Sequence, residues 1–260
     1  MSLIMTKPII LCFSGLDPSG GAGIQADIET VQAHGCHAAS IITALTVQDT
    51  KTVYGLSNVD LGVIKKQTEA IFNDMPVAAI KVGLVSNPEL VTYIANLART
   101  YQLPVIVDPV LASGDGSGLS TEQTKQNLIK AYLQDLLPLS RVVLTNTYEL
   151  QTLTQDLGNS VDVLLSTGVN AVAVTGTHDD TDDVINRLYD KSGLISEKSF
   201  PRLDAEFHGT GCTLASAVAA NIALGDDVKT AYEKAQVYTY EAISNANQLG
   251  KGQWMLERLT

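Results

Sequence analysis

The sequence predicts an α/β protein with a mainly parallel central sheet and helices on both faces of that sheet. Apolar runs of strand length alternate with segments of helical character along most of the chain, which is the pattern of successive βαβ units. The run LPVIVDPVL at residues 103–111 is almost continuously apolar, as expected of a strand buried on both faces. Glycine and polar residues follow the apolar runs and are therefore expected at the carboxyl ends of the strands, where such sheets bind ligands.

The length of 260 residues suits one large domain, residues 1–260. The chain contains no Pro/Ser-rich linker, low-complexity tract or clear internal repeat that would divide it. We therefore expect a single doubly wound unit.

In the first half of the chain, a strand at residues 8–16 leads through the glycine-rich loop LDPSGGAG into a helix. Pro88 marks the first turn of a later helix, because proline fits the first helical position. The expected strands are residues 8–16, 37–48, 52–59, 78–85 and 103–111, and the expected helices are residues 23–34, 61–73 and 87–101.

In the second half, the segments DVINRLYD and GLISEKSF, joined by KSG, predict a hairpin. Residues 213–224 are rich in Ala and contain neither Pro nor Gly, which favours a helix. The expected helices are residues 121–136, 147–155, 161–168, 213–224 and 228–248, and the expected strands are residues 141–146, 171–177, 183–190 and 193–200.

The formal net charge of −11 disfavours nucleic acids and membrane surfaces as partners, since both are polyanions. An anionic small ligand could still bind where backbone amides, a metal ion and a few cations surround it. The apolar runs are far shorter than a membrane span, and no secretory leader is visible. Three cysteines without a CxxC pair fit a reducing cytoplasm.

The segment FHGTGCTLASAVAANIALG, residues 207–225, places Gly209 and Gly211 at the mouth of a predicted helix. Backbone amides there have no intrahelical partner and the helix dipole is positive, so the segment could bind an anion. A turn into a buried helix would explain the same residues. Cys212 is expected to have a lowered pKa at this position and could act as a general base toward a hydroxyl group. Alternatively, it packs as a small apolar residue.

Acidic and amide side chains follow two further predicted strands. Asp108 could bind a metal ion or serve a turn. Asn146 and Glu149 lie at a strand-to-helix junction, where they could bind hydrated Mg²⁺ beside phosphates or cap the helix. The segment VTGTH at residues 174–178 could contact a nucleotide or form a turn.

Several enzyme classes lack their signatures in this chain. The loop at residues 14–23 is neither GxGxxG nor a Walker A loop, which argues against a dehydrogenase and a P-loop enzyme and leaves a tight turn as the alternative to ligand binding. No GxSxG elbow is present. The four histidines lack metal-ligand spacing, and we interpret each as structural or incidental: His34, His37, His178 and His208.

Six features occur in the order seen in one known family. They are SGLDPSGGAGIQADIETVQAHG, ITALTVQDT, IKVGL, VDPVLASGDG, the Asn146–Glu149 pair and HGTGCTLASAVAA. From Ile9 to about Asn245 the chain resembles the hydroxymethylpyrimidine/phosphomethylpyrimidine kinases of thiamine biosynthesis. The resemblance implies a ribokinase-like fold and transfer of phosphate, dependent on ATP and Mg²⁺, to 4-amino-5-hydroxymethyl-2-methylpyrimidine and, in many members, to its monophosphate.

On this resemblance, separate groups of residues would bind the two substrates. The pyrimidine would contact Gly15, Asp17, Ala22, Gln48, Leu84 and Val110, with Cys212 as the catalytic cysteine. The amides of Gly209, Thr210, Gly211 and Cys212 would form the anion hole. ATP would contact Asp108, Asn146, Glu149, Thr175 and Gly176, with Asp108 and Glu149 at the metal. Gln48 would read the ring nitrogen and the amino edge, since an amide both donates and accepts.

The chain departs from the family's pattern at four places. Thr145 stands where proline is usual, TGTH where KGGH is frequent, and Leu84 where methionine is common, and the tail after Gly250 differs as well. The changes on the nucleotide side leave open a pyrimidine-binding protein with weak kinase activity. The similar flat ring of pyridoxal leaves open a pyridoxal kinase. Because the family is commonly dimeric, we expect a homodimer.

Overall fold

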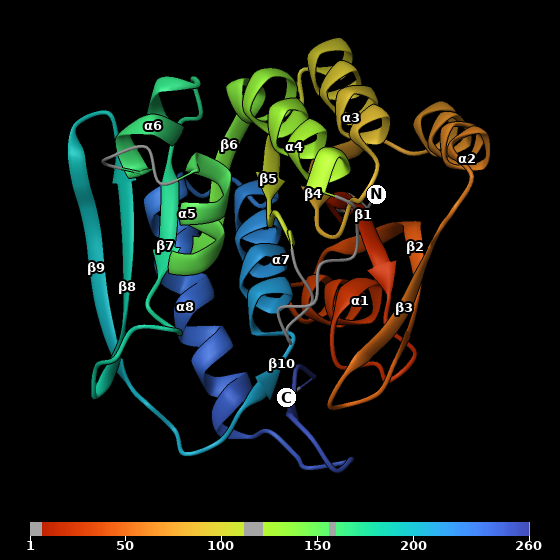
Figure 1. The fold of residues 1–260 in the computed structure, drawn as a ribbon. Helices are drawn as coiled ribbons and strands as arrows, with labels where there is room; N and C mark the ends of the chain where they lie inside the picture. The colour runs from red at the N-terminus through yellow and green to blue at the C-terminus, as the bar shows by residue number, and fades with distance from the viewer. Residues whose placement is uncertain (1–6, 112–121, 156–159, 260) are drawn as a thin grey trace, which may run out of the picture.

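The computed structural model describes residues 7–111, 122–155 and 160–259. The expected helix start at Thr121 and residues 112–116 of the segment VDPVLASGDG lie outside the described residues. One sheet crosses the described part of the molecule, as Figure 1 shows. From edge to edge its strands are β3 (Val53–Asn58), β2 (His37–Gln48), β1 (Ile9–Leu16), β4 (Val77–Val82), β5 (Val105–Val107), β6 (Ser140–Asn146), β7 (Val172–Thr175), β8 (Asp183–Asp190) and β9 (Gly193–Pro201).

The middle of the sheet is parallel and its edges are antiparallel. Strands β2, β1, β4, β5, β6 and β7 pair in parallel. At one edge β3 pairs with β2 in the antiparallel sense, and at the other edge β8 and β9 form the expected hairpin beside β7. The prediction of a mainly parallel sheet is therefore confirmed.

Helices cover both faces of the sheet, as predicted. One face carries α1 (Gly23–Ala33), α7 (Thr210–Ala223) and α8 (Val228–Ser244), and the other carries α2 (Leu61–Asp74), α3 (Pro88–Tyr101), α4 (Glu122–Ala131), α5 (Thr147–Thr154) and α6 (Ser160–Ser166). Along β1, Leu11 and Phe13 enter the core on one face, whereas Ile10 and Cys12 enter the core on the other. This alternation fixes the register of the central strand.

Several element bounds differ from the prediction. The helix expected at residues 213–224 begins at Thr210, so residues 210–212 form its first turn. Strand β5 contains three residues, and the helix after it continues as a π-helical turn at Tyr132–Leu136. Two short strands, β10 (Phe207–His208) and β11 (Trp254–Met255), pair with each other and were not predicted. Two-residue strands carry no periodicity from which a prediction could be made.

The described helices include none that is long and apolar enough to cross a membrane. The strand order reverses between β1 and β4, because the chain passes from β1 to β2 on one side and from β4 to β5 on the other. In open α/β sheets, ligands bind in the crevice outside the strand ends at such a reversal.

Candidate active site

The carboxyl ends of β1 and β4 lie side by side at the reversal of strand order. The backbone N–H of Gly83 donates to the carbonyl oxygen of Phe13 at 2.8 Å and holds the two ends together. A Cβ atom on Gly15 would lie 2.7 Å from Cδ2 of Leu84, so the side chain of Leu84 packs directly against Gly15. Two residues expected to contact the pyrimidine thus lie together.

Asp17 organises the glycine-rich loop, residues 17–22, which follows β1. Its Oδ1 accepts hydrogen bonds from the backbone N–H and the hydroxyl of Ser19 at 2.8 and 2.7 Å. Its Oδ2 accepts from the backbone N–H of Ala22 at 2.9 Å and lies 2.8 Å from Nε2 of His208. The conformation of the loop is therefore set by one carboxylate.

Gln48, the last residue of β2, also hydrogen-bonds to Asp17. Burial alone would raise the pKa of Asp17, but its hydrogen bonds, led by the one with His208, hold that pKa well below the usual value. The carboxylate is therefore ionised and engaged by the protein itself. The structure brings Asp17, Ala22 and Gln48 together, and it gives Asp17 a structural role that the sequence did not reveal.

The start of α7, residues 209–213, packs closely against the glycine-rich loop at Gly209. Gly209 has a φ of 83°, in the left-handed region, and a Cβ atom there would collide with the carbonyl oxygen of Gly21. The N–H of Thr213 donates to the carbonyl oxygen of Gly209 at 3.0 Å, and no described side chain caps the helix. The amides of residues 210–212 accordingly lie at the positive end of α7 without intrahelical partners.

Cys212 lies in this first turn and is partly exposed. The expected lowering of its pKa is wrong, because the pKa is raised to about 12. Desolvation is the main cause, and the negative charges of Asp108 and Asp27 add to it. The charge of Lys81, the largest effect after desolvation, lowers the pKa, and a hydrogen bond from the Gly23 backbone lowers it more weakly. In the ligand-free protein, Cys212 is therefore a thiol at neutral pH.

A buried polar cluster lies beside the start of α7. Nζ of Lys81 is 2.8 Å from Oδ1 of Asp27 and 3.8 Å from Oδ2 of Asp108. Asp27 also accepts hydrogen bonds from the hydroxyls of Ser14 and Ser216. Burial alone would lower the pKa of Lys81, but the carboxylate of Asp27 foremost raises it well above its ordinary value. Lys81 thus remains charged although it is fully buried.

No role was predicted for Asp27 or Lys81 from the sequence. One available signal was the lysine within the apolar run AAIKVGLV, because a charged residue in a buried strand needs a partner. His208 was interpreted as structural, which agrees with its contact with Asp17. Its place beside the glycine-rich loop could not be read from spacing along the chain.

Asn146 and Glu149 form a capping box at the start of α5. The N–H of Glu149 donates to Oδ1 of Asn146 at 2.8 Å, and the N–H of Asn146 donates to Oε2 of Glu149 at 3.0 Å. The capping alternative is therefore confirmed for this pair. Burial first and the charge of Asp108 second raise the pKa of Glu149 to about 8. The two carboxylates thus influence each other across the same space.

Asp108 and Glu149 fit a cation that takes its other ligands from water and phosphate. Oδ2 of Asp108 is buried and makes no hydrogen bond within the described residues, and burial raises the pKa of this carboxyl group. Residues 7–111, 122–155 and 160–259 contain no group of three or more His, Cys, Asp or Glu side chains that could hold a metal ion. One or two carboxylates beside substrate phosphates are the usual protein ligands of Mg²⁺.

Arg202 hydrogen-bonds along the loop that follows β7. Thr175 ends β7 in register with Asn146, and Gly176 opens the loop. The guanidinium of Arg202 donates to four carbonyl oxygens of this loop, at 2.8–3.2 Å. They are those of Gly176, Thr177, Asp179 and Thr181. Arg202 was not singled out in the sequence, because its partners are more than twenty residues away.

Two other positions lie near these elements. Val110 follows β5 and is half-buried, and its backbone N–H donates to the carbonyl oxygen of Asp108 at 2.9 Å. Thr145, which replaces the usual proline, is buried in β6, and its hydroxyl donates to the carbonyl oxygen of Ala173 at 3.3 Å. The hydroxyl of Thr145 therefore has a partner in the neighbouring strand.

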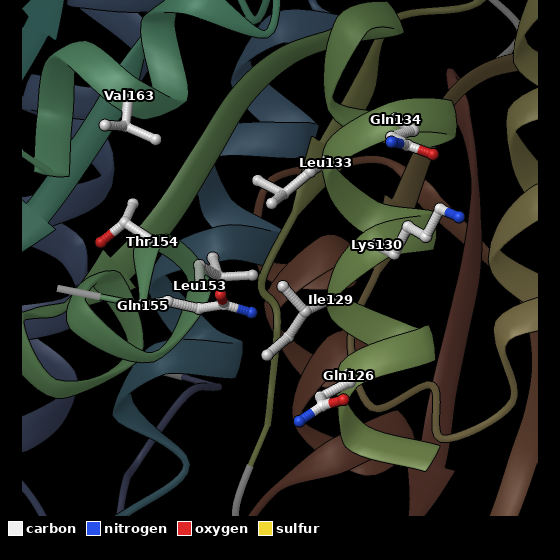
Figure 2. A pocket seen from close by; sticks show the side chains of 9 residues that line it. All are labelled: Gln126, Ile129, Lys130, Leu133, Gln134, Leu153, Thr154, Gln155 and Val163. Atoms are coloured by element: carbon white, nitrogen blue, oxygen red, sulfur yellow. The ribbon is translucent and has the colours of Figure 1, made fainter. Parts of the chain in front are cut away.

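A hollow of about 170 Å³ lies away from these residues, between α4 and the segment around α5 and α6 (Figure 2). Ile129 of α4 and Leu133 of the following π-helical turn line it on one side, and Leu153 and Val163 line it on the other. None of its lining residues is a predicted site residue. The candidate active site is therefore defined by the sheet edge and the start of α7.

Comparisons with known proteins identify the family and the fold of this chain. A family model described as phosphomethylpyrimidine kinase matches residues 17–257. A hydroxymethylpyrimidine/phosphomethylpyrimidine kinase of Rhizobium meliloti (strain 1021) is 34% identical over 253 residues, which cover 94% of this chain and 94% of that protein.

Two solved structures share the fold. A phosphomethylpyrimidine kinase from Clostridium difficile 630 has a TM-score of 0.75 at 34% identity and covers 91% of this chain and 100% of its own. The pyridoxal kinase from Staphylococcus aureus, solved in complex with AMP-PCP, has a TM-score of 0.87 at 24% identity, over 98% of this chain and 94% of its own. At that identity the likeness concerns the fold, which is the ribokinase-like α/β fold that the resemblance predicted.

The family match extends from the glycine-rich loop through the buried lysine to the start of α7 and beyond, and it covers most of the chain. The chain therefore belongs to the phosphomethylpyrimidine kinase family and is a phosphotransferase.

Proposed function

We propose that this protein transfers the terminal phosphate of ATP to 4-amino-5-hydroxymethyl-2-methylpyrimidine, and then to its monophosphate, in thiamine biosynthesis. The observation that carries the proposal is the contact between the start of α7 and the glycine-rich loop. Free amides at the positive end of a helix suit a phosphate in transfer. The adjoining loop and Gln48 suit a small polar ring.

The pyrimidine would lie between the ends of β1, β2 and β4. Its proposed contacts are Gly15, Asp17, Ala22, Gln48, Leu84 and Val110. Since the oxygens of Asp17 are already engaged by the loop, we assign Asp17 the task of shaping the pocket. The amide of Gln48 would supply one donor and one acceptor to the ring edge.

Phosphoryl transfer depends mainly on positioning and charge neutralisation rather than on covalent chemistry. The amides of Gly209, Thr210, Gly211 and Cys212 would hold the phosphoryl oxygens, and losing one such donor typically costs about 2.7–4 kcal/mol in the barrier. Cys212 would orient the hydroxymethyl oxygen. As the negative charge of Asp108 raises the Cys212 pKa, neutralising Asp108 in the nucleotide complex would favour the thiolate, which can accept the hydroxyl proton.

ATP would lie along the ends of β5, β6 and β7. We assign it to Asp108, Asn146, Glu149, Thr175 and Gly176, with Asp108 and Glu149 toward Mg²⁺. Bound Mg²⁺ supplies charge neutralisation for the phosphates. Oδ2 of Asp108, which has no hydrogen-bond partner within the described residues and lies 3.8 Å from Nζ of Lys81, supports this assignment.

A direct assay tests the proposal. Purified protein is mixed with ATP, Mg²⁺ and the pyrimidine, ADP is followed with time, and the product is identified by mass spectrometry. We expect pyrimidine-dependent ADP formation and a monophosphate product, followed by a diphosphate. An absence of pyrimidine-dependent turnover, with the protein folded and Mg²⁺ present, would contradict the proposal.

A pyridoxal kinase is the second candidate, because the Staphylococcus aureus pyridoxal kinase shares the fold at a TM-score of 0.87. We predict that Gln48→Met shifts preference away from the pyrimidine, since the thioether cannot hydrogen-bond its ring edge as the amide does. The ratio of kcat/KM for pyrimidine to that for pyridoxal should fall by about tenfold or more.

The control is Gln25→Met on α1, where the glutamine bonds Glu29 at 2.7 Å. This variant should keep the wild-type ratio. An unchanged ratio in Gln48→Met would refute Gln48 as the selecting residue.

We further propose that residues 1–260 act as one kinase domain, as a homodimer and in the cytoplasm. Exposed Leu45, Val47 and Tyr54 near one sheet edge support a dimer surface. Free thiols at all three cysteines support a reducing compartment. Sedimentation of the purified protein tests the dimer, and a monomer at all concentrations would exclude it.

A further inference from the structure

The segment after Gly250 folds back toward the candidate active site, and the family model matches it as far as residue 257. Its backbone amides at Gly252 and Gln253 donate to Thr50 Oγ1 and Thr50 O, both at 2.9 Å. Strand β11 then pairs with β10, so that Met255 lies in register with His208. Figure 1 shows this end of the chain beside β10.

Arg258 of this segment is buried, with 2% of its surface exposed. Its Nε donates to Oγ1 of Thr213 at 2.8 Å, and its Nη2 donates to the carbonyl oxygen of Gly21. Its charge is paired with Glu29, whose Oε2 lies 3.0 Å from Nη1. One planar group therefore contacts the start of α7, the glycine-rich loop and α1 at the same time.

These contacts bridge the junction between the glycine-rich loop and the start of α7, where the proposed reaction would take place. Gly21 belongs to the loop proposed to hold the pyrimidine, and Thr213 follows the amides proposed to hold the phosphate. The two segments also touch directly, since a Cβ on Gly209 would collide with Gly21 and lie 2.7 Å from Nη2 of Arg258. A guanidinium presents its donors in a rigid fork, so it fixes the relative position of two acceptors in a way that a lysine does not.

We propose that Arg258 is a positioning residue that sets the distance between the pyrimidine and the phosphate-binding amides. This inference rests on the phosphotransferase reaction proposed above. Reacting atoms must be held within a few tenths of an ångström, and a displacement of about 1 Å can cost about a hundredfold in rate. Arg258 touches neither reacting group and acts through Gly21 and Thr213.

The experiment compares Arg258→Ala, Arg258→Lys and Arg187→Ala in the full chain. Arg187 is the matched control, because it is also ion-paired, with Glu197 at 2.8 Å, but on the β8–β9 hairpin. Steady-state kinetics give kcat and KM for the pyrimidine, and thermal melting gives stability. Guanidinium chloride is then added below the concentration that unfolds each protein.

We expect Arg258→Ala to lower kcat by at least about tenfold, as befits the loss of a charge-assisted hydrogen bond, with KM changed much less. Added guanidinium should restore part of this kcat, and it should not raise the kcat of wild type or Arg187→Ala. Arg258→Lys should lie between Arg258→Ala and wild type. A purely structural role would lower the melting temperature without a kcat change that guanidinium reverses.

Wild-type kcat in Arg258→Ala, or a loss that guanidinium does not restore, overturns the inference. If Arg258→Ala does not fold, Arg258→Lys decides, and wild-type kcat in that variant overturns it. Failure of the proposed function is distinct, because it would show as a wild-type protein without turnover.

Discussion

At the scale of single residues, Cys212 shows how burial overrides a local rule. At a typical exposed site, the start of a helix stabilises a cysteine thiolate by about 0.3–1 kcal/mol. In this protein, desolvation foremost shifts the balance the other way, and the carboxylates of Asp108 and Asp27 add to it against the opposing charge of Lys81. The helix start can be recognised in the local sequence, whereas Asp108 and Asp27 lie on distant segments of the chain.

We predict that Cys212 in the ligand-free protein reacts slowly with iodoacetamide at neutral pH. Because its pKa is raised to about 12, the thiolate is scarce at pH 7, and its population rises about tenfold per pH unit below that pKa. The alkylation rate of the Cys212 peptide, measured by mass spectrometry from pH 7 to 10, should keep rising throughout. Glutathione is the control, and its rate should level off near pH 9. A plateau for Cys212 near pH 7 would contradict the raised pKa.

At the scale of elements, the junction of the glycine-rich loop with α7 depends on Gly209. We predict that Gly209→Ala destabilises the protein and lowers kcat, because a methyl group would strain the left-handed backbone and push against Gly21. The left-handed conformation alone costs about 1–2 kcal/mol. Urea unfolding should show a further loss of about 1–3 kcal/mol from overpacking.

Gly35→Ala is the matched variant, since Gly35 has a φ of 75° with nothing within 4 Å of an added Cβ. It should show only the conformational cost and keep wild-type kcat. Equal stability losses in the two variants, with kcat unchanged in both, would show that the close junction is not required.

The elements were largely predictable because most carry a hydrophobic period or a cap. The strand at residues 37–48 was predicted with both bounds, and Pro88 marked the start of α3. The first turn of α7 was missed, because glycines at 209 and 211 disfavour a helix in isolation and tertiary contacts override that preference. Strands β10 and β11 exist only because distant segments meet.

At the scale of the whole molecule, the buried cluster around Lys81 joins β1, α1, β4 and α7. We predict that Lys81→Met lowers the free energy of unfolding by about 3–5 kcal/mol, because it leaves Asp27 as a buried charge without its cation. Urea unfolding measures this loss.

The double variant Lys81→Met/Asp27→Leu should recover part of the stability, since no lone charge remains. Lys229→Met is the surface control, with Nζ 3.9 Å from Oε1 of Glu233, and it should change stability by less than about 1 kcal/mol. If Lys81→Met lost as little free energy of unfolding as Lys229→Met, the prediction that the buried cluster stabilises the protein would be contradicted.

The site was predictable where it follows from sheet topology and not where it depends on buried charge. Gln48, Asn146 and Thr175 end parallel strands, so their shared edge could be inferred from the order of elements. The partners of Lys81 and Arg258 lie on segments far away along the chain. Such pairs have no signature in one sequence, because only folding brings them together.

The central claim is that phosphate is transferred at the start of α7 beside Cys212. A crystal structure with the pyrimidine and a non-hydrolysable ATP analogue tests it most directly. We predict that the terminal phosphate accepts hydrogen bonds from the amides of residues 210–212 and that the hydroxymethyl oxygen lies against Sγ of Cys212. Both ligands bound elsewhere, with the start of α7 free of phosphate, would contradict the claim.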